Sequence, residues 1–512
     1  MKNRLFFIFL IMTFFLLFGC SSNQEKKASS LVPVSEDADP FIPDIPKEKL
    51  PENQNTPVPY YNTYTVNLDI NPALRMISGV EKVKYKNTTG NSLDEIYMNV
   101  YLNAFSQKCD YIPYLEEAKE TLFPYGIDYS IFQINSLTIN NEPVSYSLNN
   151  TVLNLKLQKP LVAEEETEIV IVFECYIPKI NTRFGANNAS LWAGSFLPTI
   201  APYNEKSGWT KSYYYPIGDS FQNTISNYEV TLTTPEGYRI AATGTGTQSE
   251  RNGKNIAVVS AKMVRDFAFS CSNEYEKATI ETKEGIPIHI YYYSKHSKNI
   301  SQLLNAAKNN LEFYTQYIGS YPYTELDIVE SNLYYEGDME FPQFVLLDSS
   351  YFEAEKEISM TSFTFGFQWF SHVINTDSVN ESWLSQGLTG FMQSYIYFDR
   401  KELDEIMTSE YELLEEALKT VKYPCLNNSL SAYEKEESFY TVQYRRARLM
   451  MYSLYKKMGE EKFRQLLKEY YTTFSFKTVT SSDFFSLCEK VYGKELDNFF
   501  QHWISSETMP KL

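Results

Sequence analysis

The 512-residue sequence is short of basic side chains and of histidine. Its 46 Lys and Arg residues are outnumbered by 64 Asp and Glu residues, which gives a net charge of −18 at pH 7. Since the basic residues also form no long run, this balance argues against nucleic acid or an anionic lipid surface as a partner. Neutral or cationic ligands are favoured instead.

Cysteine is also scarce. Apart from Cys20, the sequence has five cysteines, an odd number, widely separated and with no C-x-x-C pair, at positions 109, 175, 271, 425 and 488. This pattern predicts neither a disulfide framework nor a zinc knuckle. We expect buried free thiols, although a single disulfide stays open in an oxidising compartment.

The four histidines, at positions 289, 296, 372 and 502, include no pair spaced four residues apart. In many zinc peptidases such a pair, on one face of a helix, supplies two of the zinc ligands. We expect His372 to be a partly exposed histidine at a helix end, with a structural role rather than a metal-binding one.

The N-terminus has the features of a targeting segment. Lys2 and Arg4 form a basic start, residues 5–18 are apolar but too short to span a bilayer comfortably, and Gly19 and Cys20 follow. The stretch 17–20 resembles a bacterial lipobox, which implies cleavage before Cys20 and a lipid on its thiol. An uncleaved apolar anchor is the alternative and implies the same location. We expect residues 1–19 to be a lipoprotein signal peptide and the protein to be anchored on the extracytoplasmic face of a bacterial cell membrane.

Composition and periodicity divide the rest of the chain. Residues 20–59 are rich in Ser, Lys, Glu, Asp and Pro, which predicts a disordered tether. From Tyr64 apolar residues alternate, which predicts an antiparallel β-rich domain over 60–275. From about residue 298 the period becomes helical, and further helical stretches follow near 401–421, 444–458, 461–473 and 482–492. We therefore expect a mostly α-helical second domain over 276–512.

The stretch 363–391 is the most informative part of the chain. Phe363, Thr364 and Phe367 stand in the frame of H-E-x-x-H, and nineteen residues further on Gln386 lies within Trp-Leu-Ser-Gln-Gly, where a third ligand would be glutamate. With its flanking Gln-Trp-Phe at 368–370 and Asp-Ser at 377–378, the stretch resembles the aminopeptidase N family of zinc metallopeptidases (gluzincins), in a form whose zinc-binding residues are replaced.

Two further motifs support this resemblance. Residues 337–342, Gly-Asp-Met-Glu-Phe-Pro, are similar to the Gly-x-Met-Glu-Asn motif of the family, with Phe341 in place of asparagine. The resemblance implies that Glu340, with Gly337 and Met339 beside it, binds the free amine of a substrate. Tyr444, followed by Arg-Arg-Ala, is similar to the tyrosine that stabilises the oxyanion in the family.

The resemblance also implies the fold: an α+β multidomain protein, with an N-terminal antiparallel β-rich saddle domain followed by a mostly α-helical thermolysin-like domain that contains a small sheet ending near Val345. Between residues 363 and 369 the aromatic residues alternate strictly. Propensity alone would therefore predict a strand here, and the helix is implied only by the resemblance.

The residues in the motif lack the chemistry of a zinc peptidase. Phenylalanine has no lone pair to offer a metal, Thr364 cannot replace glutamate as the general base, and Gln386 offers a neutral carbonyl. We expect Phe363 and Phe367 to meet on one helix face instead. The family's zinc is thus predicted to be absent, with no other cofactor. An acid and base pair drawn from Asp338, Glu340, Asp377 and Glu381 stays open, because the sequence does not give their separations.

These observations favour a surface-anchored lipoprotein with an aminopeptidase-like fold, catalytically inactive, that binds peptides or protein segments in its remnant cleft. Two alternatives stay open. One is a metallopeptidase or other hydrolase that acts on peptide N-termini through a non-standard site. The other is a purely structural or assembly role. Whether the protein is an enzyme is not decided by the sequence.

Overall fold

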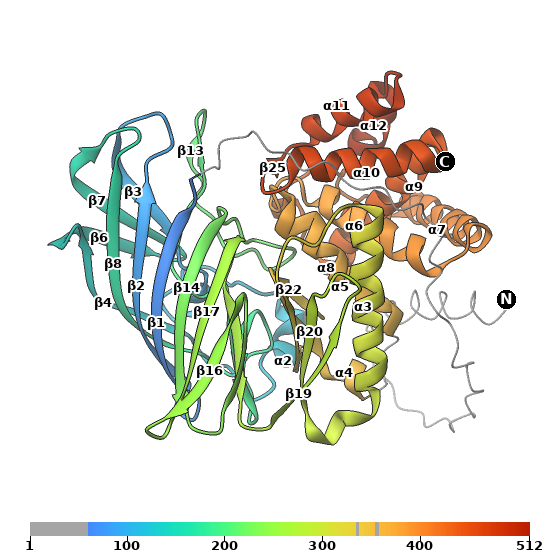
Figure 1. Cartoon of the computed structure of the whole chain (residues 1–512). Helices are drawn as coiled ribbons and strands as arrows, with labels where there is room; N and C mark the ends of the chain where they lie inside the picture. The colour runs from blue at the N-terminus through green and yellow to red at the C-terminus, as the bar shows by residue number, and fades with distance from the viewer. Residues whose placement is uncertain (1–59, 334–336, 354–357) are drawn as a thin grey trace.

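The computed structural model describes residues 60–333, 337–353 and 358–512. Strands of the N-terminal half and helices of the C-terminal half lie on opposite sides of the molecule (Figure 1). The signal peptide and tether predicted for residues 1–59 lie outside the described residues. Within the described ranges, no helix is both long enough and apolar enough to cross a membrane.

The N-terminal domain is built on an eight-stranded sheet. In spatial order its strands are β16 (Thr245–Arg251), β17 (Lys254–Val264), β14 (Ser226–Pro235), β1 (Asn62–Asn71), β2 (Met76–Lys86), β8 (Glu166–Tyr176), β4 (Ile131–Ile139) and β5 (Glu142–Pro143). Alternate residues of β1 from Tyr64 to Ile70 are buried, as the period of two predicts. One pairing is not antiparallel: β1 runs parallel to β14, with Tyr64 opposite Tyr228 and their rings stacked 4.7 Å apart.

Smaller sheets complete this domain. One has the order β15 (Arg239–Ala242), β18 (Ala268–Ser272), β10 (Ser190–Gly194) and β9 (Phe184–Ala186). Another has the order β11 (Thr199–Ile200), β3 (Leu93–Asn99), β7 (Val152–Leu161) and β6 (Ser145–Asn149). The remaining elements are the hairpin of β12 (Tyr203–Asn204) and β13 (Gly208–Trp209) and the short helices η1 (Tyr101–Phe105), η2 (Glu116–Ala118) and α2 (Lys119–Leu122).

The second domain begins with a five-stranded sheet. Its order is β19 (Tyr275–Glu281), β20 (Pro287–Tyr293), β21 (Leu326–Ser331), β23 (Phe344–Asp348) and β22 (Met339–Phe341). A compact apolar cluster joins this sheet to the β15–β18–β10 sheet, with Trp192 and Ala268 from the first domain and Tyr291, Val329 and Phe341 from the second. The two domains therefore share a continuous buried layer.

The rest of the second domain is helical. Its longer helices are α3 (Ile300–Tyr317), α6 (Ser382–Tyr397), α7 (Arg400–Thr420), α9 (Ala447–Met458), α10 (Glu460–Phe474), α11 (Ser481–Tyr492) and α12 (Asp497–Ser505). Its shorter elements are η3 (Ser294–Asn299), α4 (Ser349–Phe352), η4 (Ile358–Met360), α5 (Thr361–Phe367), η5 (Gln368–Val373), η6 (Leu430–Ala432), α8 (Glu436–Phe439), η7 (Tyr440–Arg446) and the strand pair β24 (Asn375–Thr376) and β25 (Thr478–Val479).

The aromatic segment that alternates like a strand is the helix α5, continued by the π-helical turn η5. Four aromatic residues at alternate positions also make two i, i+4 pairs, and the fold uses that spacing. Phe365 and Trp369 face the core, where Trp369 stacks on Tyr314 at 5.1 Å and its Nε1 donates to the Gly319 carbonyl at 2.8 Å. Burial on both faces, rather than period-two alternation, explains the pattern.

Candidate functional site

An aromatic cluster, defined here as Phe363, Phe367, Tyr440 and Tyr444, lies where α5 meets η7. The ring centroids of Phe363 and Phe367 are 4.9 Å apart, as their i, i+4 spacing predicts. The Phe363 ring also meets Tyr444 at 5.2 Å, and Tyr444 stacks on Tyr440 at 4.7 Å. Phe363 is half-buried and Phe367 is buried. The two positions that the resemblance assigns to histidine ligands are therefore in edge-to-face aromatic contact.

π-Helical segments contribute to both sides of this cluster. The segment η5 begins directly after Phe367, and η7 carries Tyr440 and Tyr444. π-Helical turns are rare and occur often at functional sites, because the extra residue redirects side chains. Their presence on both sides of the cluster supports this region as the functional centre of the fold.

The Tyr444 hydroxyl is already engaged. It donates to Gln393 Oε1 at 2.9 Å and accepts from Arg448 at 3.3 Å. Its ring packs against α6 at Gly390, where an added Cβ would lie 2.7 Å from the ring. In this arrangement Tyr444 supports α6 as well as bordering the cluster.

Glu340 lies on β22 and is half-buried. Its carboxyl group accepts a hydrogen bond from its own backbone amide. Burial raises the pKa of Glu340 to about 8, although the Arg183 guanidinium acts to lower it. A half-buried carboxyl group that keeps further acceptor positions can bind a cationic ligand, which would favour its ionised form.

Arg183, which the sequence analysis did not single out, connects the two domains at Glu340. Its guanidinium lies between the rings of Phe221 and Phe341, 4.4 and 4.3 Å from their centroids, and donates to the Glu340 carbonyl at 3.0 Å. The same charge opposes the rise in the pKa of Asp266, which burial brings to about 6. An arginine 157 residues before Glu340 has no local sequence signal that could have placed it there.

The Glu340 strand is held against the motif helix by polar contacts. Thr364 donates from its hydroxyl to Asp338 at 3.2 Å. Gln368 donates to the Phe341 carbonyl at 2.9 Å and accepts from the Gln343 amide at 3.1 Å. Thr364, predicted as the degenerate general-base position, therefore has a structural role. Gly337 has φ +76°, a left-handed conformation that favours glycine, and Met339 is buried in the apolar layer between the domains.

Gln386 is half-buried on α6, and among the described residues its side chain makes no hydrogen bond. The donor set at the three positions that the resemblance assigns to zinc ligands is thus two phenyl rings and one neutral amide. Zinc in proteins is bound by thiolate, imidazole and carboxylate groups. These three residues do not fit the family's metal.

The prediction of a partly exposed His372 is wrong. His372 lies in the π-helical turn η5 and is only 7% exposed, near the charges of Arg183 and Arg265 from the first domain. Its Nε2 atom is buried without a hydrogen-bond partner in the described part of the chain. Burial, followed by the charges of Arg183 and Arg265, lowers the pKa of His372 well below its usual value, so the ring is neutral.

The other candidate carboxylates are occupied by structural hydrogen bonds. Asp377 accepts from the amides of Val379 and Asn380, each at 3.1 Å, and Glu381 accepts from the Ser481 amide at 3.1 Å. Asp338 accepts from the Asp348 amide at 3.2 Å in addition to Thr364. These contacts fix turns and helix starts and do not assemble an acid and base pair around Glu340.

The five cysteines outside the N-terminal segment are free thiols. Cys175, Cys271 and Cys488 are buried, whereas Cys109 and Cys425 are half-buried. Burial raises the pKa of each buried thiol, which keeps it protonated and unreactive.

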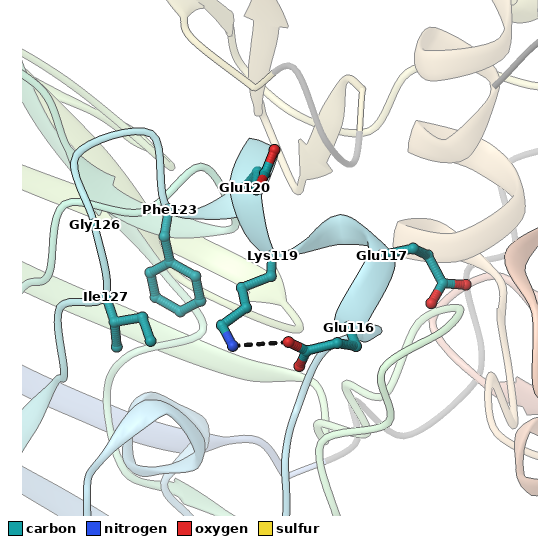
Figure 2. A pocket seen from close by; sticks show the side chains of 7 residues that line it. All are labelled: Glu116, Glu117, Lys119, Glu120, Phe123, Gly126 and Ile127. Atoms are coloured by element: carbon teal, nitrogen blue, oxygen red, sulfur yellow. Dashed lines mark hydrogen bonds and ion pairs between the residues drawn. The ribbon is translucent and has the colours of Figure 1, made fainter. Parts of the chain in front are cut away.

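A separate cavity of about 530 Å³ opens on the first domain. Figure 2 shows its lining: the acidic side chains Glu116, Glu117 and Glu120, with Lys119 paired to Glu116 at 2.8 Å, and the apolar Phe123 and Ile127. Burial, followed by the charge of Glu117, raises the pKa of Glu436 on α8. Glu117 of this cavity therefore lies near Glu436, on the helix α8 that directly precedes η7 and Tyr444.

The fold and these motifs define a class: two-domain proteins with the architecture of an aminopeptidase. Residues 302–503 match the Peptidase family M1 domain. Among solved structures, the M1 zinc metallopeptidase from Deinococcus radiodurans is similar, with a TM-score of 0.64 and 15% sequence identity over 88% of this chain and 95% of that one.

The chain is also similar in sequence to curated aminopeptidases. The chain is 24% identical over 223 residues to the probable aminopeptidase 2 of Sulfurisphaera tokodaii, covering 40% of this chain and 28% of that protein. It is 23% identical over 264 residues to human endoplasmic reticulum aminopeptidase 1, covering 47% and 28%. The matches thus span little more than a quarter of these relatives. Together these comparisons show that residues 302–503 resemble the peptidase family M1 domain and that the two-domain fold is that of the M1 zinc metallopeptidase structure.

Proposed function

We propose that this protein is a non-catalytic, aminopeptidase-like lipoprotein whose cleft binds the amino-terminal end of peptides or of protein segments. In this proposal it is attached through a lipid on Cys20 to the extracytoplasmic face of a bacterial cell membrane. The observation that carries the proposal is the contrast between two motifs: the metal-binding positions hold Phe363, Phe367 and Gln386, whereas Glu340 of the amine-binding motif is kept.

The loss of catalysis is argued from donor chemistry. A peptidase of this family requires three metal ligands and a general base. All four positions have changed here; the two phenyl rings contact each other, and the Phe363 ring also contacts Tyr444. The carboxylates that could form an alternative acid and base pair hold amides and hydroxyls instead.

Peptide binding is argued from Glu340. Its carboxyl group accepts from its own backbone amide, and its pKa of about 8 reflects burial. A protonated α-amine would supply further donors and a countercharge. The acidic cavity beside α8 would attract the same positively charged ligands. The Deinococcus radiodurans M1 zinc metallopeptidase has been solved with a Tyr-Ser-Ala substrate, which is consistent with peptide binding on this fold.

Calorimetric titration of the mature chain in detergent, with a set of short peptides bearing free or acetylated N-termini, tests the proposal. We expect binding of the free-amine peptides, at least about tenfold weaker after Glu340→Gln because one charge-assisted pair is lost. Glu205→Gln, an exposed change, is the matched control. Equal affinity for the free and acetylated peptides, or for wild type and Glu340→Gln, would contradict the role of Glu340.

The rival function is a hydrolase with a non-standard site. A panel of aminoacyl fluorogenic substrates separates the two, since the proposal expects no turnover above the buffer blank. Turnover that is abolished by a chelator, and unaffected by inhibitors of co-purifying peptidases, would establish the enzyme instead.

A further inference from the structure

A cluster of metal-ligating side chains lies outside the candidate site, on the sheet of the second domain. His289 on β20, Asp327 on β21 and Glu325 just before β21 each offer a ligand atom, and these three atoms lie within 4.8 Å of one another. His289 and Asp327 are direct partners in the parallel pair β20–β21. Glu325 is two residues before Asp327 and so shares its face of the sheet. Strand register brings His289 and Asp327 together, and Glu325 joins them from the residue that precedes β21.

Asp327 supplies an observation beyond the clustering. It is 3% exposed, and its Oδ2 accepts from the Ala242 amide of the first domain at 3.1 Å. Its Oδ1 is buried with no hydrogen-bond partner among residues 60–333, 337–353 and 358–512. A buried carboxylate oxygen that is left unpaired is costly. A bound cation would satisfy it.

His289 is oriented for ligation. Its Nδ1 is hydrogen-bonded at 2.8 Å to the hydroxyl of Thr279, its register partner on β19. In the tautomer whose Nδ1–H donates to Thr279, the lone pair of Nε2 is available to a metal. Such a hydrogen bond on the second ring nitrogen is a common feature of metal-binding histidines.

Lys277 lies on the neighbouring strand β19, and its charge acts on both Glu325 and Asp327. Its Nζ is placed over the Tyr291 ring at 5.1 Å. His289 and Glu325 are both half-buried, so the site can be reached from solvent.

His296 also lies beside two carboxyl groups, but unlike His289 it has no ring nitrogen available to a metal. Both ring nitrogens of His296 are taken, Nδ1 by Glu330 at 2.5 Å and Nε2 by Glu353 at 3.0 Å. Each ring nitrogen is thus engaged by a carboxyl group, and neither is available to a metal. The contrast makes His296 a control for His289.

We propose that His289, Glu325 and Asp327 bind one divalent first-row transition metal ion, with Zn²⁺ as the best match. One imidazole nitrogen and two carboxylate oxygens form a mixed donor set that suits this class, whereas Ca²⁺ and Mg²⁺ favour all-oxygen sets. Three protein ligands leave a coordination position for water. The proposal is independent of peptide binding, because none of the three residues belongs to the motifs around Glu340.

The test is calorimetric titration of ZnCl₂ into the mature, untagged full chain, with metal analysis after dialysis. We expect one ion per chain, and at least about tenfold weaker binding for His289→Gln and for Asp327→Asn. His296→Gln and His502→Ala should bind as wild type does. No zinc binding by wild type, or unchanged binding by both His289→Gln and Asp327→Asn, would overturn the proposal.

A second measurement needs no variant. Zinc should protect His289 from diethyl pyrocarbonate in the wild-type chain, while the exposed His502 stays reactive, with the modified peptides identified by mass spectrometry. Modification of His289 at the same rate with and without zinc would refute the site even if the variants fail to fold.

Discussion

At the scale of the residue, burial without a matching partner distinguishes the side chains of the candidate site. Glu340 is a half-buried carboxyl group whose pKa burial raises to about 8, and His372 is a buried neutral imidazole with an unpaired Nε2. Such groups cost stability in a resting protein. Their grouping around Arg183 is the strongest sign that this part of the fold serves binding.

The raised pKa of Glu340 predicts that the stability of the folded protein depends on pH. Its folded pKa of about 8 lies above the ordinary value of 4.5, so between these pH values the folded state keeps a proton that the unfolded state loses. The stability linked to Glu340 is therefore complete below about pH 4.5 and is lost as the pH rises through 8, by at most about 1.4 kcal/mol per pH unit.

Urea unfolding at a series of pH values checks this. The free energy of unfolding of wild type minus that of Glu340→Gln should fall as the pH rises from 5 to 8. The difference between wild type and the exposed Glu205→Gln should stay flat. A flat difference curve for Glu340→Gln as well would show that the carboxyl group is ionised and well solvated.

At the scale of the element, the packing of α6 depends on the close approach of the Tyr444 ring to Gly390. An added Cβ at Gly390 would lie 2.7 Å from the Tyr444 ring. Glycine to alanine in an exposed helix usually stabilises by up to about 1 kcal/mol, but overpacking here should reverse the sign. We predict that Gly390→Ala destabilises the protein by about 1–3 kcal/mol, measured by denaturant unfolding. The exposed Thr408→Ala on α7 should change stability by less than about 0.5 kcal/mol.

A buried ion-pair network joins α7 to η7 and α9. Glu410, 5% exposed, pairs with Arg445 at 3.0 Å and also with Arg448, the residue that donates to the Tyr444 hydroxyl. Glu410→Gln would leave two arginines without their carboxylate and should cost about 3–5 kcal/mol. Glu416→Gln breaks the exposed pair with Lys419 and should cost no more than about 1 kcal/mol. Similar thermal shifts for the two variants would mean that the Glu410 network is solvated.

At the scale of the whole molecule, contacts between the domains position the site. Arg183 of the first domain reaches the Glu340 strand, and Gln222 donates to Asp377 of the second. The positions of Glu340 and Asp377 thus depend on contacts from both domains.

The membrane anchor predicted from the sequence is also tested on the whole molecule. Cys20→Ser removes the thiol that the lipobox-like stretch predicts to be lipidated. We expect the variant to lose incorporation of labelled fatty acid and to keep its uncleaved signal segment, as seen by gel mobility and mass spectrometry. Unchanged labelling after Cys20→Ser would rule out this site of lipid attachment.

Local sequence features predicted much of this architecture. The period-two pattern of β1, the four C-terminal helical stretches and the meeting of Phe363 with Phe367 all follow from short-range periodicity. The helical state of α5 did not follow from periodicity, because its aromatic spacing satisfies a strand and an i, i+4 helix equally. The exposure of His372 was predicted wrongly, since it lies buried in a π-helical turn near Arg183 and Arg265 of the first domain.

The sequence by itself determined the donor chemistry: which positions carry phenyl rings, amides or carboxylates, and hence which reactions the motif residues can support. Only the tertiary structure decided which of those groups contact one another. Arg183 meets Glu340 across 157 residues, and His289 meets Asp327 through strand pairing. The physical reason is that chemical identity and local period belong to neighbouring residues, whereas burial, charge pairing and ligand geometry arise from contacts that form only when distant segments pack together.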